Sequence, residues 1–153
     1  MKKMKELIVS AIDSGTVIDH IPAKSVMQVV RILGLEDFEN TILIGTNFDS
    51  KKLEKKGIIK VKGKFFKPEI INKIALVAPQ ATLTIIENYD VKDKTVVEVP
   101  EDIIGLVKCA NPKCISNHEE ITTEFKVVNK TNGLKLKCHF CEKTFGQEDM
   151  RIV

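Results

Sequence analysis

The chain has 153 residues, enough for one domain or two small ones, and its hydrophobic fraction of 43% can form a core. No apolar run approaches the roughly 18–20 residues that cross a membrane. The net charge is +3, and neither residues 1–100 (16 basic, 13 acidic) nor residues 101–153 (8 and 8) carry the basic excess of a duplex-DNA binder. We therefore expect a soluble, cytoplasmic protein that binds neither membranes nor nucleic acid.

The first part of the chain is predicted to form two strands and a helix. Residues 7–12 and 16–21 are short apolar runs, and Asp13-Ser14-Gly15 between them is typical of a turn. Pro22 suits the first position of a helix, and Gly34 helps to end it. Between them, apolar side chains recur at the spacing of one helix face. These side chains are Val26, Val29, Val30 and Leu33.

The next part repeats the pattern. Residues 41–45 and 58–61 are predicted to be strands, with glycines as punctuation. Pro68 opens a second helix with the same apolar spacing. Its stripe consists of Ile71, Ile74, Ala75 and Ala78. Two further strands are predicted over residues 81–87 and 95–99.

Strand, helix, strand, strand, helix, strand is the element order of the ferredoxin-like fold. We therefore predict an α+β domain over residues 1–100, in which two helices cover one face of an antiparallel sheet. From residue 101 the pattern changes to short strands, which predicts a small all-β domain over residues 101–153. The expected strands are 103–108, 124–128 and 134–137, and the hairpin signal Asn132-Gly133 joins the last two.

All four cysteines lie in this second domain. Cys109 and Cys114 form a C-x4-C pair, and Cys138 and Cys141 form a C-x2-C pair. A tetrahedral zinc ion needs four soft donors, and each short spacing supplies two of them from one tight turn. Four thiolates leave no open position, so the predicted zinc is structural. A domain of about fifty residues usually needs such a staple.

Disulfides, a redox-active C-x-x-C and ligation by histidine are the alternatives. The sequence shows no signal-peptide pattern, and a reducing compartment keeps thiols free. A redox pair would use Cys138 and Cys141 and leave the other two idle. His118 and His139 lie near the cysteines and could replace one of them, although four thiols already complete the site.

A second possible site lies at the end of the strand over residues 16–21. Asp19 and His20 form either an ordinary polar strand end or a ligand site. In a ligand site, a carboxylate accepts from sugar hydroxyls and an imidazole meets a phosphate. Lys60 and Lys94, near other strand ends, either add contacts to this ligand or are solvated. The sequence contains no common glycine-rich phosphate loop and no nucleophile elbow or catalytic triad pattern.

Several segments of the chain resemble the regulatory chain of aspartate carbamoyltransferase, and together they span nearly the whole sequence. They are residues 16–23 (TVIDHIPA), 78–82 (APQAT), Asn88-Tyr89, 109–115 and 136–143. The resemblance implies a non-catalytic subunit that regulates pyrimidine biosynthesis. Its first domain is expected to bind ATP as activator and CTP, alone or with UTP, as inhibitor.

The resemblance also implies the partners and the cofactor. The second domain is expected to hold one structural Zn²⁺ per chain and to dock on a catalytic chain that carries the active sites. The implied assembly has two catalytic trimers bridged by three regulatory dimers, so the chain also pairs with itself.

Residue roles at the effector site follow from the resemblance as well. The expected set is Val9, Ala11, Ile12, Asp19, His20, Lys60, Ile86, Tyr89, Val91 and Lys94. Residues 9, 11, 12, 86 and 89 would contact the base, and Val91 would pack nearby. Asp19 would hold the ribose, Lys60 the base and sugar, and His20 and Lys94 the phosphates. The chain departs from better-known enterobacterial relatives, which have a carboxylate in place of Ser10 and an amide in place of Thr84.

A nucleic-acid-binding zinc-ribbon regulator is the alternative from another class of protein. Sheets that read RNA normally display aromatic side chains on their central strands. Residues 7–9 and 83–86, the expected central strands, contain none. The sequence therefore favours the regulatory chain.

Overall fold

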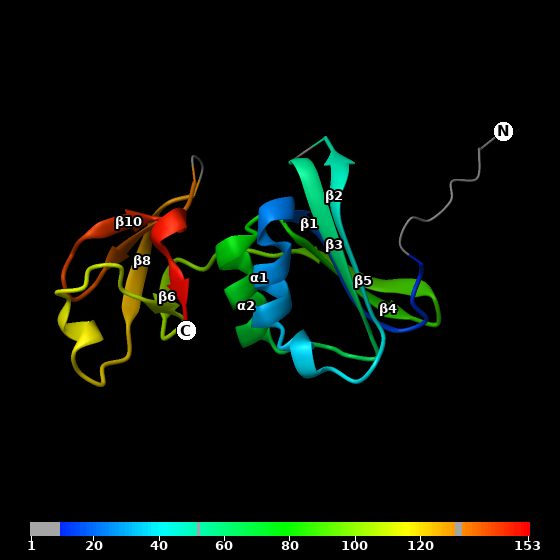
Figure 1. The fold of residues 1–153 in the computed structure, drawn as a ribbon, viewed down its shortest axis with the longest axis horizontal. Helices are drawn as coiled ribbons and strands as arrows, with labels where there is room; N and C mark the ends of the chain where they lie inside the picture. The colour runs from blue at the N-terminus through cyan, green and yellow to red at the C-terminus, as the bar shows by residue number, and fades with distance from the viewer. Residues whose placement is uncertain (1–9, 52, 131–132) are drawn as a thin grey trace. The chain divides into compact units, whose positions relative to one another are not determined.

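The computed structural model describes residues 10–51, 53–130 and 133–153, and Figure 1 shows its fold. The chain divides into two compact units, of which the first ends at Glu98 and the second begins at Val99. Each unit has its own buried apolar side chains. Among the described residues, no helix is long and apolar enough to span a bilayer.

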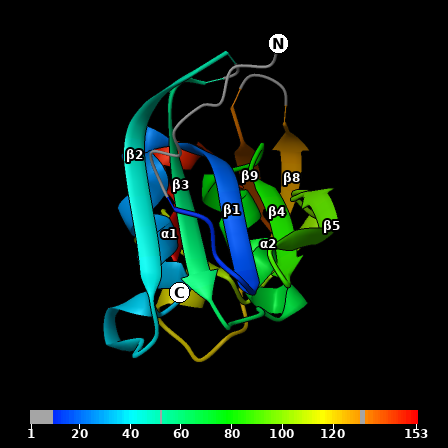
Figure 2. The same cartoon turned by 90° about the vertical axis from the view of Figure 1, so that its right-hand side faces the viewer.

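The first unit contains a five-stranded antiparallel sheet with the order β2-β3-β1-β4-β5. The strands are β1 (Gly15–Pro22), β2 (Ile42–Ser50), β3 (Glu54–Lys62), β4 (Thr82–Glu87) and β5 (Asp90–Val96). Helices α1 (Val26–Ile32) and α2 (Pro68–Val77) both lie on one face of this sheet (Figure 2). The predicted ferredoxin-like arrangement is confirmed, with β5 added at one edge.

The two helices bury the apolar stripes that the sequence predicts. Val26 and Val29 of α1 and Ile74 and Ala75 of α2 are almost completely buried. Burying such an aliphatic side chain contributes about 1.5–3 kcal/mol, which fixes the face each helix presents to the sheet. Pro68 occupies the first turn of α2 as expected. Pro22, by contrast, ends β1 and caps a short 3₁₀ helix (Ala23–Ser25) that precedes α1.

Four strand predictions in the first unit need correction. The strand predicted over residues 95–99 lies earlier, at Asp90–Val96, because a two-residue turn at Asn88 and Tyr89 reverses the chain directly after β4. Residues 10–12, predicted to end a strand, are in no regular element, and residues 7–9 lie outside the described residues. Strands β2 and β3 are longer than predicted and pair as far as Ser50 and Glu54.

The second unit consists of short strands. They are β6 (Asp102–Ile104), β7 (Val107–Lys108), β8 (Glu124–Asn129), β9 (Lys135–Cys138), β10 (Thr144–Gly146) and β11 (Arg151–Ile152). The sheets have the orders β10-β9-β8-β6 and β11-β7. Phe125 packs edge-to-face on Phe145, with ring centroids 5.5 Å apart, beside buried Ile103 and Leu136. Strands β8 and β9 pair antiparallel as predicted, although Asn132 of the hairpin signal lies outside the described residues.

Candidate functional site: a four-cysteine cluster and the open face of the sheet

The four cysteine sulfurs converge in the second unit. All four Sγ atoms lie within 4.8 Å of one another. The Sγ atoms of Cys109 and Cys141 are 3.7 Å apart, and so are those of Cys114 and Cys138. Metal–sulfur bonds of about 2.3 Å, as Zn²⁺ forms, place tetrahedral sulfurs about 3.8 Å apart. The cluster therefore has the dimensions of a tetrahedral thiolate site for a divalent metal.

All four cysteines are free thiols, so the structure does not contain the disulfides that the sequence left as an alternative. The two histidines that could have replaced a thiol are outside the cluster. Nε2 of His118 lies 2.7 Å from the carbonyl oxygen of Pro112, and the ring of His139 lies edge-to-face against Phe140. Among the described residues, the group that could hold a metal ion thus consists of the four cysteines that the sequence singled out.

Tight turns position each pair of sulfurs. In the first pair, the N–H of Cys114 donates to the carbonyl of Asn111 at 3.0 Å, and the N–H of Asn111 faces the sulfur of Cys109 at 3.5 Å. In the second pair, the N–H of Glu142 donates to the carbonyl of Cys138 at 2.9 Å, and Glu142 itself adopts φ 62°. Both turns point two sulfurs toward the same centre.

The surroundings of the cysteines shift the pKa values of their thiols in different directions. Burial raises the pKa of the Cys109 thiol, and burial also raises the pKa of Cys138. Burial acts in the same direction on Cys141, but hydrogen bonds, including one from the N–H of Lys143, outweigh it and lower the pKa of Cys141 to about 7. A divalent cation that binds here takes the place of the thiol protons.

The sheet face opposite the helices, here called the open face, is the second candidate site. Cross-strand neighbours share a face of a sheet, and the register pairs Val17 with both Lys60 and Thr84, and Thr84 with Lys94. The alternate positions on β3, such as Ile59, are buried toward the helices. Lys60 and Lys94 therefore lie in one row across four strands, with Val17 and Thr84 between them.

Asp19 and His20 lie at the end of this face, where β1 is irregular. The register of β1 against β3 shifts between Ile18 and Ile21, and His20 has φ 59°, a left-handed conformation rare for a non-glycine residue. The backbone N–H of His20 donates to Oδ1 of Asp19 at 2.6 Å. The bulge thus turns two consecutive polar side chains toward one region, instead of alternate faces of the sheet.

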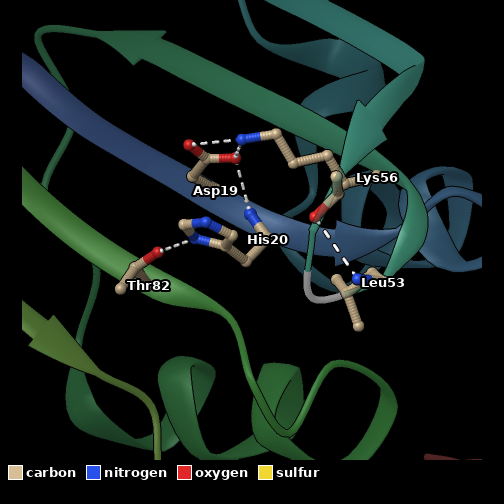
Figure 3. A network of polar contacts seen from close by, with 6 residues as sticks. Asp19, His20, Leu53, Lys56 and Thr82 are labelled. Carbon is tan, nitrogen blue, oxygen red and sulfur yellow. Dashed lines mark hydrogen bonds and ion pairs between the residues drawn. The ribbon is translucent and has the colours of Figure 1, made fainter.

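Two neighbours that sequence reasoning missed complete this network (Figure 3). Nζ of Lys56 lies 2.9 Å from Oδ1 and 3.1 Å from Oδ2 of Asp19. Nδ1 of His20 lies 2.6 Å from Oγ1 of Thr82 on β4. Burial acts to raise the pKa of Asp19, but Lys56 and the N–H of His20 outweigh it and lower that pKa below its ordinary value. The carboxylate is therefore held ionised and oriented.

The segment that precedes β1 lies against the open face. Nζ of Lys60 donates to the carbonyl of Ser10 at 3.0 Å, and Figure 2 shows residues 10–14 passing in front of β3. Ile12 is buried, and the N–H of Tyr89 donates to the carbonyl of Asp13 at 2.8 Å. Burial lowers the pKa of Lys60, and the nearby Asp19 carboxylate opposes this shift. The segment and the β4–β5 turn thus border the same region.

The remaining predicted effector residues fall around this region to different degrees. Ala11 is exposed next to Ile12, while Ile86 is buried on β4. Tyr89 and Val91 are 69% and 61% exposed at the β4–β5 turn. Val9 lies outside the described residues. The structure therefore gathers Asp19, His20, Lys60 and Lys94 with residues 10–12 and the turn at one face of the first unit.

Fold and site together define a two-part chain: an α+β unit with a polar open face, and a small unit organised around a four-thiol metal site. Residues 7–98 match the family model of the aspartate carbamoyltransferase regulatory chain, allosteric domain. Residues 101–151 match the model of the metal binding domain of the same chain.

Individual relatives agree with the family models. The chain is 54% identical over 149 residues to the aspartate carbamoyltransferase regulatory chain of Pyrococcus horikoshii, covering 96% of this chain and 97% of that one. It is 48% identical over 151 residues to the same protein of Parabacteroides distasonis, covering 99% and 97%. The chain therefore belongs to the family of aspartate carbamoyltransferase regulatory chains. It is a non-catalytic subunit, with a catalytic chain as its partner in the enzyme complex.

Proposed function

We propose that the open face binds nucleoside triphosphates, ATP, CTP and UTP among them, and that the second unit holds zinc and passes the effect of binding to the catalytic chain. The observation that carries the proposal is the grouping of Asp19, His20, Lys60 and Lys94 on one sheet face. These side chains come from three different strands, and the sheet register and the β1 bulge bring them together. One carboxylate, one imidazole and two ammonium groups suit a ribose and a triphosphate.

Effector discrimination must come from contacts with the base, because ATP and CTP carry the same triphosphate. We assign the shared affinity to His20 and Lys94, which face the phosphates. The base then lies toward residues 11–12, Lys60 and the turn at Tyr89, where backbone groups and an exposed ring are available. Lys56 and Thr82 act by holding Asp19 and His20 in the orientations that the ligand meets.

Zinc is the metal we propose for the cysteine cluster. Soft thiolate donors in a closed tetrahedral set favour Zn²⁺ among the divalent ions of cells, and such sites are structural. A reducing compartment such as the cytoplasm keeps the four thiols available. The ion would join the two turns at Cys109–Cys114 and Cys138–Cys141 and so stabilise the second unit.

The second unit also offers a surface for the catalytic chain. A hollow of about 260 Å³ lies over the sheet, on the side of the charged residues of β8 and β9. Its polar lining residues are Asp102, Glu124, Lys126, Lys137, His139 and Glu142. Alternating acidic and basic groups fit a polar protein surface better than an apolar ligand. This hollow belongs to the second unit, whereas the proposed nucleotide-binding residues belong to the first, as separate docking and effector sites require.

Regulation then depends on unequal affinity for two quaternary states of the complex. We propose two catalytic trimers bridged by three dimers of this chain. An effector can shift such an equilibrium only by the difference between its affinities for the two states. Couplings of about 1–3 kcal/mol, a 5- to 150-fold change in affinity, are typical.

Nucleotide titration of the purified chain tests the effector site. Isothermal titration should detect binding of ATP and CTP, and Lys94→Ala should weaken both by a similar factor of about 10, because one charge-assisted phosphate contact is lost. Lys92→Ala is the matched control: it removes the same charge two residues away on β5, where Lys92 pairs with Glu87 at 3.0 Å.

Equal affinity of wild type and Lys94→Ala for both nucleotides would contradict the proposed role. An equal loss in Lys92→Ala would show that only the general charge of β5 matters. Repeating the titration with catalytic trimers present separates binding from transmission.

A further inference from the structure

The four sulfurs of the metal site differ in the groups that donate hydrogen bonds to them. Backbone N–H groups serve three of them: Asn111 faces Cys109, Phe140 and Cys141 face Cys138, and Lys143 faces Cys141. The hydrogen-bonding neighbour of Cys114, apart from other sulfurs, is a side chain. Its Sγ lies 3.0 Å from Oγ of Ser116, and both residues are buried. A side-chain change at Ser116 can therefore alter the surroundings of this sulfur, as a change at Asn111, whose side chain bonds the sulfur of Cys141, can alter those of Cys141.

Asn117, the next residue, closes the loop that carries the first two ligands. Its Nδ2 donates to the carbonyl of Cys109 at 3.0 Å and to the carbonyl of Asn111 at 2.8 Å. Both acceptors are carbonyl oxygens, so only the NH₂ side of the amide can face them. The other side, Oδ1, is buried without a hydrogen-bond partner among the described residues. The nitrogen of the Asn117 amide therefore bonds two carbonyl groups of the loop, while the oxygen of the same amide stays unpaired.

When a metal ion is bound, Ser116 and Asn117 contribute more to the stability of the site. Four thiolates around a divalent cation leave a net charge of −2 in a largely buried site, and hydrogen-bond donors to the sulfurs offset it. Ser116 can donate its hydroxyl proton to the Cys114 thiolate. Asn117 bonds two carbonyl groups of the 109–114 loop. These bonds keep the sulfurs of Cys109 and Cys114 at the separation that the ion requires.

We propose that Ser116 and Asn117 are positioning residues of the metal site: the Ser116 hydroxyl stabilises the Cys114 thiolate, and the Asn117 amide holds the 109–114 loop in its metal-binding shape. This inference rests on the proposed zinc site and adds to it two side chains that do not themselves touch the ion.

Metal release from the full chain tests the proposal. Wild type, Ser116→Ala and Asn117→Ala are loaded with Zn²⁺, and transfer of the ion to a chromogenic chelator is followed at neutral pH. Loss of such neighbours typically weakens metal affinity about 10- to 100-fold, and release should accelerate within that range. Asn117→Asp should release faster than Asn117→Ala, because it sets an oxygen against two carbonyl oxygens.

Thr123→Ala is the matched control. It removes another buried hydroxyl of the same unit, which donates to the carbonyl of Val107 at 2.6 Å and not to a sulfur. Release from Thr123→Ala should stay within about 3-fold of wild type, below the range expected for lost neighbours of the ligands. Equal acceleration in Thr123→Ala would show that the unit merely loosens, and would overturn the assignment.

Cobalt provides a readout that general loosening does not produce. With Co²⁺ in place of Zn²⁺, the sulfur-to-metal charge-transfer band should shift to lower energy in Ser116→Ala, because a thiolate that accepts fewer hydrogen bonds is a better electron donor. Asn117→Ala should keep the band position while releasing the ion faster. Wild-type rates and spectra in both variants would refute the inference. A wild-type chain that holds neither ion would instead refute the zinc site itself.

Discussion

The pair formed by Asp19 and Lys56 shows how the surroundings of one residue determine the strength of an ion pair. The Asp19 side chain is 26% exposed, and that of Lys56 is 22% exposed. A second pair in the same unit, Asp49 with Lys55, is shorter at 2.6 Å, but Asp49 is 93% exposed. Water and salt weaken an exposed pair, so the longer and more buried pair should contribute more to stability.

Asp19→Asn is therefore expected to destabilise the chain in a pH-dependent way. The pKa of Asp19 is lowered from 3.8 in the folded protein, so the carboxylate stabilises the fold at pH values above 3.8 and this contribution is lost as the pH falls through the lowered pKa. The substitution should cost about 1–2 kcal/mol at pH 7 and progressively less below pH 4. Urea unfolding at pH 7 and pH 3 measures both values.

Asp49→Asn provides the comparison. Its urea midpoint should differ little from wild type at either pH, because that carboxylate is surrounded by solvent. A loss in Asp19→Asn that is the same at both pH values would mean that packing, not charge, explains the effect.

Sequence reasoning reached some of these residues and missed others for a physical reason. Asp19 and His20 are adjacent and polar in an apolar strand, which is a local signal. Lys56 and Thr82 are ordinary residues of ordinary strands. They join the network because β1 lies between β3 and β4 and because its bulge turns His20 toward Thr82. Register and bulges are properties of the folded sheet that no short sequence window contains.

At the scale of elements, the contact between β3 and α1 depends on the absence of a side chain at Gly57. A Cβ at this position would lie 2.1 Å from Cγ2 of Val26 and 3.0 Å from the carbonyl oxygen of Gly45. The first atom belongs to a stiff, fully buried side chain, and the second belongs to the backbone of β2. Neither can move away without disturbing the helix or the sheet.

Gly57→Ala should consequently destabilise the first unit by about 1–3 kcal/mol, the usual cost of overpacking. Thermal or urea unfolding measures the loss. The double variant Gly57→Ala with Val26→Ala should lose less than the sum of the two single variants, since removing the valine methyl groups makes room for the new Cβ. Strict additivity would show that the clash with Val26 is not the cause.

The elements themselves could be predicted where the pattern was apolar and periodic. The helix stripes and the order of strands and helices were of this kind, and the cysteine turns were predicted from the short spacing within each pair. Strand β5 was misplaced because all seven of its residues are exposed, so its sequence lacks the alternation that marks a half-buried strand. Its position follows from the turn before it, where Asn88 and Tyr89 have φ values of 51° and 66°.

At the scale of the whole molecule, the two units should differ in their response to metal removal. The first unit has its own helix-covered core, whereas the second has about fifty residues in short strands around four sulfurs. A unit this small depends on its metal for much of its folding free energy. Chelation should therefore unfold the second unit while the first remains folded.

Proton NMR and titration can follow the two units separately. In the apo chain, the dispersed resonances of residues 99–153 should collapse, and binding of the catalytic trimer should be lost. ATP affinity should stay within about 2-fold of its starting value, because the proposed nucleotide residues all belong to the first unit. Apo chain that still assembles with catalytic trimers would rule out the metal unit as the connection between effector and catalyst.

One backbone hydrogen bond joins the two borders of the proposed nucleotide pocket. The amide of Tyr89, at the tip of the β4–β5 turn, donates to the carbonyl of Asp13, just ahead of β1. A nucleotide base that pushes the turn outward therefore also pulls on the chain leading to residues 10–12. Bases of different size would displace both borders together, so a purine and a pyrimidine would leave residues 10–13 in different positions.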